Sequence, residues 1–506
     1  MDLSTIRHFP IRADPARLAS VSEEQALRFR KAFAVAGYLS PSPEKVPEVI
    51  EMRARGGRNL PRLFRLTAAE RPLDVLARLF LLGVTVRAAV ARAAMSPIPL
   101  EEWCKAGLLQ TDGEHVQGLV AISYFDGLLL ASEKPELLDC GAQEDYVCGM
   151  TNSTAALVQF RVQRPFHDIL DLGTGCGVLG FLAARQGGQV LATDMNSRAI
   201  QFATFNARLN GISNIEFATG STFEPAGGRK FDLILANPPC VLGPAARYSF
   251  RDSGQELDSL CRQIVAEAPD YLEEGGIFQC TAEWPNFGGA DWRKRISEWL
   301  HDLPCDALVL HLCTKDAPFH AEETVFDTDV LDFREQGRLY DAYAEYFEGR
   351  GVTSISEGLI ALRRRSGTAR NWVQLEHLPN RQPDSFGNAV WQYFAASDEI
   401  ERLGNGLFDL KLQMAPSLAV TTARTWDGKA WSEGSYALRQ GEGFKFEASV
   451  DASIANLIRQ CDGTRTLREL AAGSAADAKV PFDAIAAGCL NVMRQMLQRG
   501  FLVLPE

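Results

Sequence analysis

The sequence predicts an α/β protein built around a doubly wound, seven-stranded, mostly parallel sheet of the Rossmann-like kind, flanked by N- and C-terminal helical, winged-helix-like domains. Three observations lead to this class. Short apolar segments alternate with helical ones through the middle of the chain, which is typical of a parallel sheet with helices on both faces. A glycine-rich turn joins the first of these segments to a helix. Helical periodicity returns on both sides of this region.

The length of 506 residues corresponds to about three domains at roughly 150 residues each. We expect an N-terminal helical, winged-helix-like domain over 1–138 and a ligand-binding α/β domain over 139–380. The C-terminal region, 381–506, should hold an irregular β segment and a winged-helix-like module.

Local signals support the two flanking domains. In the first, Ser22 can cap a helix in the sequence S-E-E-Q, and an Asp112-Gly113 turn predicts a hairpin after several helices. In the last, the residues after His377 are irregular up to residue 445 and rich in Trp, Gly and Ser. A Thr466-x-x-Glu469 capping box then opens a helix.

Candidate strands of the central sheet cover 168–172, 189–193, 214–218, 231–236, 275–281 and 306–312, with a last pair near 357–363 and 371–377. Helices between them should begin near Gly177, Asn196 and Asp252.

Composition limits the partners and the compartment. The 64 acidic residues exceed the 52 basic ones by 12, so no global cationic field attracts the chain to nucleic acid or to anionic lipid. The 11 cysteines include no C-x-x-C pair, which favours reduced thiols and no metal site. The N-terminus lacks the apolar core of a signal peptide, and the most apolar stretch is too short for a bilayer. We therefore expect a cytoplasmic protein with no membrane partner.

A glycine loop follows the first central strand, in the sequence D-L-G-T-G-C-G that begins at Asp171. Glycine lets the backbone approach a ligand closely, and a helix start presents unpaired N–H groups. One interpretation is a dinucleotide fingerprint, G-x-G-x-x-G, formed by Gly175, Gly177 and Gly180, with Asp194 as the acid that binds a ribose.

The second interpretation is a loop for S-adenosylmethionine, in which one acid precedes the glycines and another ends the next strand. Asp171 fills the first position and Asp194 the second. A carboxylate at Asp171 would repel a pyrophosphate, whereas it can accept hydrogen bonds from the ammonium group of a methionine. A glycine-rich turn without a ligand would require this acid–loop–acid spacing to arise without use.

An Asn-Pro-Pro-Cys segment, Asn237 to Cys240, follows the strand over 231–236. Ligands of open α/β sheets bind at the carboxyl ends of strands, so Asn237 should lie beside the ligand of the glycine loop. The prolines remove backbone donors, which leaves the Asn237 side-chain oxygen and the Pro238 carbonyl as acceptors aimed in one direction. Such a pair can hold a planar –NH2 group and favour the state in which its nitrogen becomes positive. The segment therefore favours methyl transfer from S-adenosylmethionine to nitrogen over a simple strand-ending turn.

The segments DLGTGCGVLG, ATDMN and LANPPC, in this order and spacing, resemble the class I S-adenosylmethionine-dependent methyltransferases of the Asn-Pro-Pro group. That group includes the glutamine methyltransferases of release factors and N-methyltransferases of nucleobases. The resemblance is specific over residues 141–282 and weaker to residue 377. It implies a Rossmann-like methyltransferase fold with S-adenosylmethionine as the cofactor.

By this resemblance the catalytic residues would be Asn237, Pro238, Pro239 and Cys240. The residues that bind the cofactor would be Tyr146, Thr151, Asp171, Gly173, Thr174, Gly175, Cys176, Gly177, Asp194, Met195, Asn196, Ser221, Thr222, Phe223 and Asn237. The glycine loop would line the methionine end, Asp194 the ribose and Met195 the adenine.

Cys240 departs from the pattern of the group, which usually has Tyr, Phe or Trp after the second proline. A thiol lacks the stacking face that is worth about 1–3 kcal/mol for a base on an aromatic ring. Either Tyr248 or Phe250 replaces the ring, or the target is not a nucleobase; Arg251 is a further candidate for substrate contact. We do not expect Cys240 to act as a nucleophile, because no neighbouring Lys, Arg or His in the sequence would lower its pKa.

The preferred hypothesis is an N-methyltransferase whose acceptor is a planar amide or amine nitrogen on a protein or peptide side chain, because the chain is acidic and the stacking ring is absent. A nucleobase in RNA or DNA comes second, and a small metabolite comes third. Arginines that could contact nucleic-acid phosphates are Arg53, Arg55, Arg58, Arg62 and Arg65. A non-catalytic regulator whose winged helices bind DNA is the alternative from a different class.

Overall fold

The computed structural model describes residues 11–39, 60–135, 137, 144–244, 248, 250–326, 332–365, 371–378, 386–426 and 428–504. The chain divides into two compact units. The first comprises Met1–Val158 and Arg164–Pro379, and the second comprises Gln159–Gln163 and Asn380–Glu506. The three domain ranges expected from the sequence stay a prediction.

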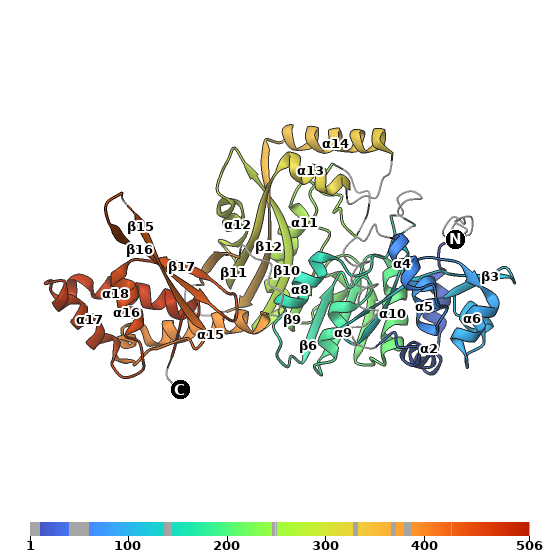
Figure 1. Ribbon diagram of the computed structural model, residues 1–506, viewed down its shortest axis with the longest axis horizontal. Helices are drawn as coiled ribbons and strands as arrows, with labels where there is room; N and C mark the ends of the chain where they lie inside the picture. Colours follow the sequence, from blue (N-terminus) through green and yellow to red (C-terminus); the bar gives the residue numbers. More distant parts are fainter. Residues whose placement is uncertain are drawn as a thin grey trace. The chain divides into compact units, whose positions relative to one another are not determined.

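The N-terminal part of the first unit is mainly helical, with short strands (Figure 1). Its elements are α1 (Pro15–Ser20), α2 (Glu23–Val35), α4 (Leu60–Leu66), α5 (Pro72–Phe80), β1 (Val86–Arg87), α6 (Ala88–Met95), α7 (Leu100–Lys105), β2 (Leu109–Thr111), β3 (His115–Gly118), β4 (Ala121–Phe125) and β5 (Leu128–Ser132). Strands β1, β3 and β2 form an antiparallel sheet in that order, and β4 pairs with β5. The predicted cap of α2 is confirmed, because the Ser22 hydroxyl accepts a hydrogen bond from the Gln25 N–H at 3.2 Å.

A common hydrophobic core joins these helices to one helix of the α/β region. The rings of Phe29, Phe33, Phe80 and Trp103 lie 4.5 to 6.2 Å apart between centroids. The same cluster includes Phe202 of α10 (Ser197–Asn210). Burying a Phe side chain contributes about 1.5–3 kcal/mol, so these contacts hold α10 firmly against the N-terminal helices.

Eight strands form the central sheet, and they match the eight candidate segments, whereas the count of seven expected for the sheet is wrong. They are β6 (Asp168–Leu172), β7 (Gln189–Asp194), β8 (Ile215–Thr219), β9 (Phe231–Ala236), β10 (Leu272–Phe287), β11 (Cys305–Asp316), β12 (Val352–Arg364) and β13 (Val373–His377), in the order β13-β11-β12-β10-β9-β6-β7-β8. The eighth member is β13, which extends the sheet by pairing in parallel with the outer side of β11. Only β12 runs antiparallel to its neighbours, which confirms the mostly parallel class.

The helices of this region are α8 (Asn152–Phe160), α9 (Val178–Ala184), α10, α11 (Ser259–Glu267), α12 (Trp292–Leu300), α13 (Ala317–Phe326) and α14 (Phe333–Glu348), with 3-10 turns η3 (Glu224–Ala226) and η4 (Ala268–Tyr271). The predicted starts at Gly177 and Asn196 are confirmed, since these residues are the N-caps of α9 and α10. The start predicted near Asp252 is wrong. Asp252 instead accepts hydrogen bonds from Arg251 Nε at 2.8 Å and from the Tyr248 N–H at 3.0 Å, which closes a turn before the helix.

The second unit contains more helix than the sequence suggested. Its elements are α15 (Gly387–Leu403), η5 (Gly404–Asp409), β14 (Gln413–Met414), β15 (Leu418–Trp426), β16 (Trp431–Gln440), β17 (Glu447–Val450), α16 (Ala452–Arg459), α17 (Leu467–Asp477), α18 (Phe482–Gln498) and β18 (Leu502–Val503). Helix α15 lies in the stretch expected to be irregular, because burial of Val390, Tyr393 and Phe394 on one face outweighs the modest helix propensity of aromatic residues. The predicted capping box of α17 is confirmed by reciprocal hydrogen bonds between Thr466 and Glu469.

Throughout the ranges that the structure describes, no helix is both long enough and apolar enough to cross a membrane.

Candidate active site

The carboxyl ends of β6, β7 and β9 meet where the strand order of the sheet reverses. Strand β6 lies between β7 and β9, and the chain leaves these three strands at Gly173, Met195 and Asn237. Open α/β sheets bind their ligands at such a switch point. The three sequence motifs therefore lie at one edge of one sheet.

The glycine loop combines positive φ angles with open space. Gly173, Gly175 and Gly177 have φ of 75°, 54° and 98°, a region that costs other residues about 1–2 kcal/mol. A Cβ added at Gly173 or Gly175 would meet no atom within 4 Å, whereas one at Gly177 would lie 2.2 Å from the ring of Phe181. Gly177 is thus required by packing, while Gly173 and Gly175 leave room for a ligand against the backbone.

Asp171 supplies a buried carboxylate at the base of this loop. One oxygen, Oδ2, accepts hydrogen bonds from the Thr174 hydroxyl at 2.6 Å and from the Gly180 N–H at 2.9 Å. The other oxygen, Oδ1, is buried without a hydrogen-bond partner among the described residues. Burial raises the pKa of Asp171 to about 6. A buried carboxylate oxygen without a donor is suited to a cationic group of a ligand.

Asp194 lies on the other side of the loop, at the end of β7. Its Oδ2 accepts a hydrogen bond from the Gly175 N–H and its Oδ1 one from the Asn196 N–H, both at 2.9 Å. Burial raises the pKa of Asp194 above its ordinary value. Each oxygen retains a lone pair, so the carboxylate can still accept bonds from two hydroxyl groups.

The Asn237 side chain is held from two sides. Its Nδ2 donates to the hydroxyls of Ser153 and Thr154, at 3.3 and 3.0 Å, at the start of α8. Its Oδ1 accepts a hydrogen bond from the Thr281 hydroxyl on β10 at 2.6 Å. A carbonyl oxygen has two lone pairs, so one lone pair of Oδ1 remains for a substrate.

Cys240 ends the Asn-Pro-Pro-Cys segment with a protonated thiol. Pro238 is buried, and Pro239 and Cys240 are half-buried. Burial raises the pKa of Cys240 well above its ordinary value, and the carboxylates of Glu283 and Glu357 raise it further. The thiol therefore lacks the thiolate character that a nucleophile needs.

Two of the three residues proposed for substrate contact are enclosed. Tyr248 is 1% exposed, and the Arg251 guanidinium lies over its ring at 5.0 Å. Arg251 also pairs with Asp252. A ring so enclosed offers little exposed surface for stacking in this structure, and the proposed substrate contact of Tyr248 stays a prediction. Phe250 is half-buried, and its ring contacts those of Tyr248 and Tyr146 at 5.5 and 5.4 Å.

The segment after β8 offers polar atoms and one core ring. Thr222 has φ of 43°, and Ser221 is exposed. Phe223 is 1% exposed, and its ring stacks on that of Tyr271 with centroids 4.5 Å apart, which anchors this turn in the core. Met195, at the end of β7, is 70% exposed.

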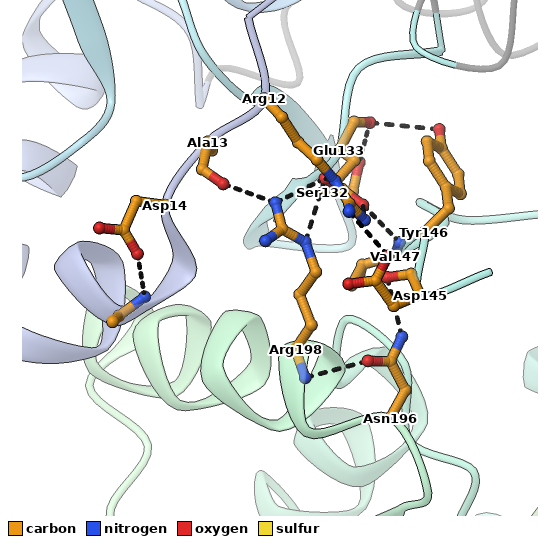
Figure 2. A network of polar contacts seen from close by, with 11 residues as sticks. Arg12, Ala13, Asp14, Ser132, Glu133, Asp145, Tyr146, Val147, Asn196 and Arg198 are labelled. Carbon is orange, nitrogen blue, oxygen red and sulfur yellow. Dashed lines mark hydrogen bonds and ion pairs between the residues drawn. The ribbon is translucent and has the colours of Figure 1, made fainter. Parts of the chain in front are cut away.

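The segment from Glu144 to Met150 comes next to the end of β7. The Asn196 side chain donates to the Asp145 carbonyl oxygen at 3.0 Å, and the Tyr146 hydroxyl donates to the Glu133 carbonyl oxygen at 3.4 Å (Figure 2). Thr151 is among the residues predicted to bind the cofactor. Its hydroxyl lies 2.9 Å from that of Ser153 and 2.8 Å from that of Thr154, which joins it to the hydroxyls that hold Asn237. Cys176 is buried, and burial raises its pKa to about 11.

Three polar residues near the Asn-Pro-Pro-Cys segment, on β10 and β12, were not predicted from the sequence. Thr281 and Glu283 lie on one face of β10, since side chains alternate along a strand, and Glu357 of β12 is directly opposite Glu283. Glu283 Oε2 lies 3.0 Å from Nε2 of His320 on α13 and accepts a weaker bond from the Leu242 N–H at 3.4 Å. The period-2 pattern of the predicted strand over 275–281 was the available signal. Its pairing with β12 could not be read from the sequence.

Within the described ranges, no three His, Cys, Asp or Glu side chains are grouped closely enough to hold a metal ion.

Residues 149–284 match the family described as the methyltransferase small domain. This stretch contains the glycine loop, both acids and the Asn-Pro-Pro segment, and the match supports a class I S-adenosylmethionine-dependent methyltransferase of the Asn-Pro-Pro group. On either side, residues 54–119 and 392–504 match two families described as domains of unknown function, DUF7059 and DUF7782.

The most similar curated proteins include the release factor glutamine methyltransferase of Xylella fastidiosa strain 9a5c, 36% identical over 26% of this chain and 54% of that protein. That of Aliivibrio fischeri is 42% identical over 24% of this chain and 43% of that protein. Ribosomal RNA small subunit methyltransferase C of Alcanivorax borkumensis is 32% identical over 22% of this chain and 31% of that protein. The chain thus spans about half, or less, of the length of these relatives. Among solved structures, a methyltransferase from Pyrococcus furiosus aligns with a TM-score of 0.27 and 14% identity, over 43% of this chain and 84% of that one.

Proposed function

We propose that this protein is an S-adenosylmethionine-dependent N-methyltransferase whose acceptor is a planar amide or amine nitrogen on a protein or peptide side chain. The arrangement of Asn237 carries the proposal. Hydroxyls of α8 and β10 hold its amide beside the glycine loop, and one lone pair of Oδ1 is left for a substrate. The chain covers only part of the relatives that it resembles, so the proposal rests on this geometry as well as on their names.

The residues present fit the cofactor. The unpartnered Oδ1 of Asp171 suits the ammonium of the methionine, and the open backbone at Gly173 and Gly175, with Thr174, Cys176 and Gly177 beside it, suits its chain. Asp194 would bind the ribose hydroxyls, and Met195 would contact the adenine, with Ser221, Thr222 and Phe223 at the edge. Tyr146, Thr151 and Asn196 would close the site.

When bound, the cofactor supplies a methyl group on a positively charged sulfur. The protein's part is to orient the acceptor nitrogen. Asn237 Oδ1 and the Pro238 carbonyl oxygen would accept hydrogen bonds from the two N–H groups of the acceptor nitrogen. These bonds would stabilise the positive charge that develops on that nitrogen. Positioning of this kind requires no strong base. The protonated thiol of Cys240 would contact the acceptor without reacting.

The side of the site where the methyl acceptor would bind, here called the acceptor side, carries the carboxylates of Glu283 and Glu357. It suits groups that donate hydrogen bonds better than it suits phosphates. Glu283 and Glu357 lie on neighbouring strands near Cys240, and Glu357 is 3.7 Å from Lys315. Carboxylates in this place would repel the backbone of a nucleic acid and attract amide or amine N–H groups. The names of the release-factor relatives agree with a side-chain amide.

A nucleobase amine in RNA or DNA is the second candidate, supported by the relative named as a ribosomal RNA methyltransferase. Arg62 and Arg65 are exposed on α4 and could meet phosphates, whereas Arg53, Arg55 and Arg58 lie outside the described residues. A small metabolite acceptor and a non-catalytic DNA-binding role are the remaining alternatives.

We also infer that the two flanking domains, 1–138 and 381–506, are winged-helix-like and help to bind the acceptor. We infer further that the protein acts in the cytoplasm. The order of α5, β1, α6, α7 and the β2–β3 hairpin supports the first assignment. Every cysteine in the described part of the chain is a free thiol, in keeping with a reducing compartment.

Transfer of a labelled methyl group into fractionated lysate tests the function directly. Label that protease removes and nuclease leaves would support the proposed acceptor, and nuclease-sensitive label would replace it with the second candidate. Label in neither polymer would indicate a small metabolite. Salt-dependent DNA binding without any transfer would point to a regulator. Calorimetric titration with S-adenosylhomocysteine, repeated with Asp194→Ala, checks the cofactor; binding of NAD in its place would refute the proposal.

A further inference from the structure

A buried carboxylate connects the N-terminal segment to the cofactor side of the site. The Glu133 side chain is fully buried and lies between two guanidinium groups (Figure 2). Arg12 donates to its two oxygens from Nε at 2.6 Å and from Nη2 at 2.9 Å. Arg198 donates to Oε1 from Nη2 at 2.6 Å and from Nε at 3.1 Å. Paired guanidinium contacts of this kind are short and directional.

The same group of side chains holds the segment that precedes the methyltransferase domain. The Val147 N–H donates to Glu133 Oε2 at 2.9 Å, and the Glu133 N–H donates to the Val147 carbonyl oxygen at 3.0 Å. Arg12 forms a second ion pair, from Nη1 to Asp145 Oδ1 at 2.7 Å. Arg12 therefore contacts both ends of the stretch from Glu133 to Asp145, from a position more than a hundred residues earlier in the chain.

On its other side the segment reaches the ribose-binding acid of the proposed site. Asn196 donates to the Asp145 carbonyl oxygen, and the Asn196 N–H donates to Asp194. Asn196 Oδ1 in turn accepts a hydrogen bond from the N–H of Arg198, the second partner of Glu133. The contacts form a closed path through Arg12, Glu133, Arg198, Asn196 and Asp145, as Figure 2 shows.

Tyr146 extends the path toward the acceptor side. Its ring lies 5.4 Å from that of Phe250, which follows the Asn-Pro-Pro segment. A shift of the segment would therefore alter the surroundings of both the cofactor and the acceptor.

We propose that Arg12, which lies outside the methyltransferase domain, is a positioning residue of the cofactor site. Through Glu133 and Asp145 it holds residues 144–147 against the turn from Asp194 to Asn196, so the affinity for the cofactor depends on the N-terminal segment. This inference rests on the proposed function, because it takes the turn at Asp194 as the place where the ribose binds.

Charge explains why Arg12 acts on affinity more than on folding. Without Arg12, the buried Glu133 keeps the guanidinium of Arg198, so no buried carboxylate is left unpaired. Asp145, whose side chain is 54% exposed, would return to water. The segment from 144 to 147 would keep its contacts to Glu133 and Asn196 but lose the ion pair that restrains it from the other side.

Calorimetric titration of the full chain with S-adenosylhomocysteine, and separately with adenosine, tests the proposal. We expect Arg12→Gln to weaken both ligands by about tenfold or more, a usual size for coupling between sites. The two ligands should lose the same factor, since both contain the ribose. Arg12→Lys should recover part of the affinity, because it keeps the charge and loses the paired contacts. Asp145→Asn should give an intermediate loss without changing the buried pair.

Arg28→Gln is the matched control, because Arg28 makes a similar double contact to Glu102 between α2 and α7, at 3.0 and 3.4 Å. It should leave the affinity unchanged. Melting temperatures without ligand must stay close to that of the wild type for Arg12→Gln or Asp145→Asn, so that an effect on affinity is separated from one on folding. Wild-type affinity in both Arg12→Gln and Asp145→Asn would overturn the inference. Absence of binding by the wild type would overturn the proposed function itself.

Discussion

Asn237 joins the cofactor side of the site to the acceptor side. Its two N–H donors are used by Ser153 and Thr154, and its Oδ1 accepts a bond from Thr281. These contacts fix the direction of the remaining lone pair before any substrate binds. In the proposed reaction, Asn237 would therefore act by orientation more than by basicity.

Replacing Asn237 with Ala should reduce methyl transfer by at least about a hundredfold, the usual cost of removing one preorganised polar group. S-adenosylhomocysteine should still bind, because Asp171 and Asp194 remain. Rates from labelled-methyl transfer and affinities from calorimetry measure the two effects separately. Thr281→Val, which removes only the hydroxyl that orients Oδ1, should give a smaller loss. Full activity in Asn237→Ala would refute the role of this residue.

Asp171 should make binding of the proposed cofactor depend on pH. Burial raises the pKa of Asp171 to about 6. The contribution of this carboxyl group to the stability of the free protein is therefore largest when the pH is below the ordinary pKa of an aspartate, and it is lost as the pH rises through 6. The cofactor's ammonium requires the ionised carboxylate, so the affinity for S-adenosylhomocysteine should rise with pH up to about pH 7 and then level off.

Calorimetry from pH 5 to pH 8 measures this dependence. If only the ionised form binds, the affinity should fall by up to about tenfold per pH unit below pH 6. Asp171→Asn should bind more weakly and lose most of the slope, which separates Asp171 from Asp194. A slope that persists in Asp171→Asn would assign the titration to another group.

At the scale of elements, the glycine loop differs from the other tight turns of the sheet because its open side faces a proposed ligand. Gly175 and Gly187 both have positive φ, and a Cβ at either would meet no atom within 4 Å. Gly187 lies in the turn between α9 and β7, away from the strand ends that form the site. A residue with a side chain would therefore be strained equally at the two positions, but only Gly175 lies at the proposed ligand site.

Gly175→Ala should abolish measurable cofactor binding, because the methyl group would occupy space that the ligand needs. Gly187→Ala should leave binding unchanged. Both should lower the free energy of unfolding by about 1–2 kcal/mol, the cost of a left-handed conformation for an L-residue. Denaturant titration measures the free energy of unfolding, and calorimetry measures cofactor binding. Equal loss of binding in the two variants would indicate a general effect on stability.

At the scale of the whole molecule, the net charge of −12 and the carboxylates on the acceptor side act in the same direction. Both weaken contact with a polyanion, whereas an acceptor on a protein needs no long-range attraction. Exposed arginines of α4 would have to overcome this field locally if RNA were the acceptor.

Methyl transfer into the lysate fraction that contains the acceptor should therefore change little when salt is raised from about 50 to about 200 mM. A nucleic-acid acceptor held by several phosphate contacts would lose affinity by about a thousandfold or more over that range. The initial rate at subsaturating acceptor is the quantity to compare. A steep decline would favour the nucleobase hypothesis over the side-chain amide.

The sequence was most informative where a function depends on residues that are close along the chain. The positions of Asp171, Gly173, Gly175, Asp194 and Asn237 follow from strand ends and fixed spacing, and they lie together at one edge of the sheet because parallel strands share an edge. Capping residues such as Ser22 and Thr466 could be predicted for the same reason.

Contacts between distant segments could not be predicted in this way. The partners of Asn237 on α8 and β10, the pairing of Glu283 with Glu357, and the enclosure of Tyr248 depend on which strands and loops become neighbours. So does the contact of Arg12 with Glu133, across 121 positions of the chain. Helix α15 likewise forms where local propensity is weak and burial decides.

By itself, then, the sequence determined the class of fold and the edge of the sheet at which the predicted site residues meet, because these depend on local periodicity and on short spacings between strand ends. Only the tertiary structure decided what holds those residues in place and which neighbours line the acceptor side. The physical reason is that burial and hydrogen bonding between distant segments are properties of the packed chain, and a linear pattern does not contain them.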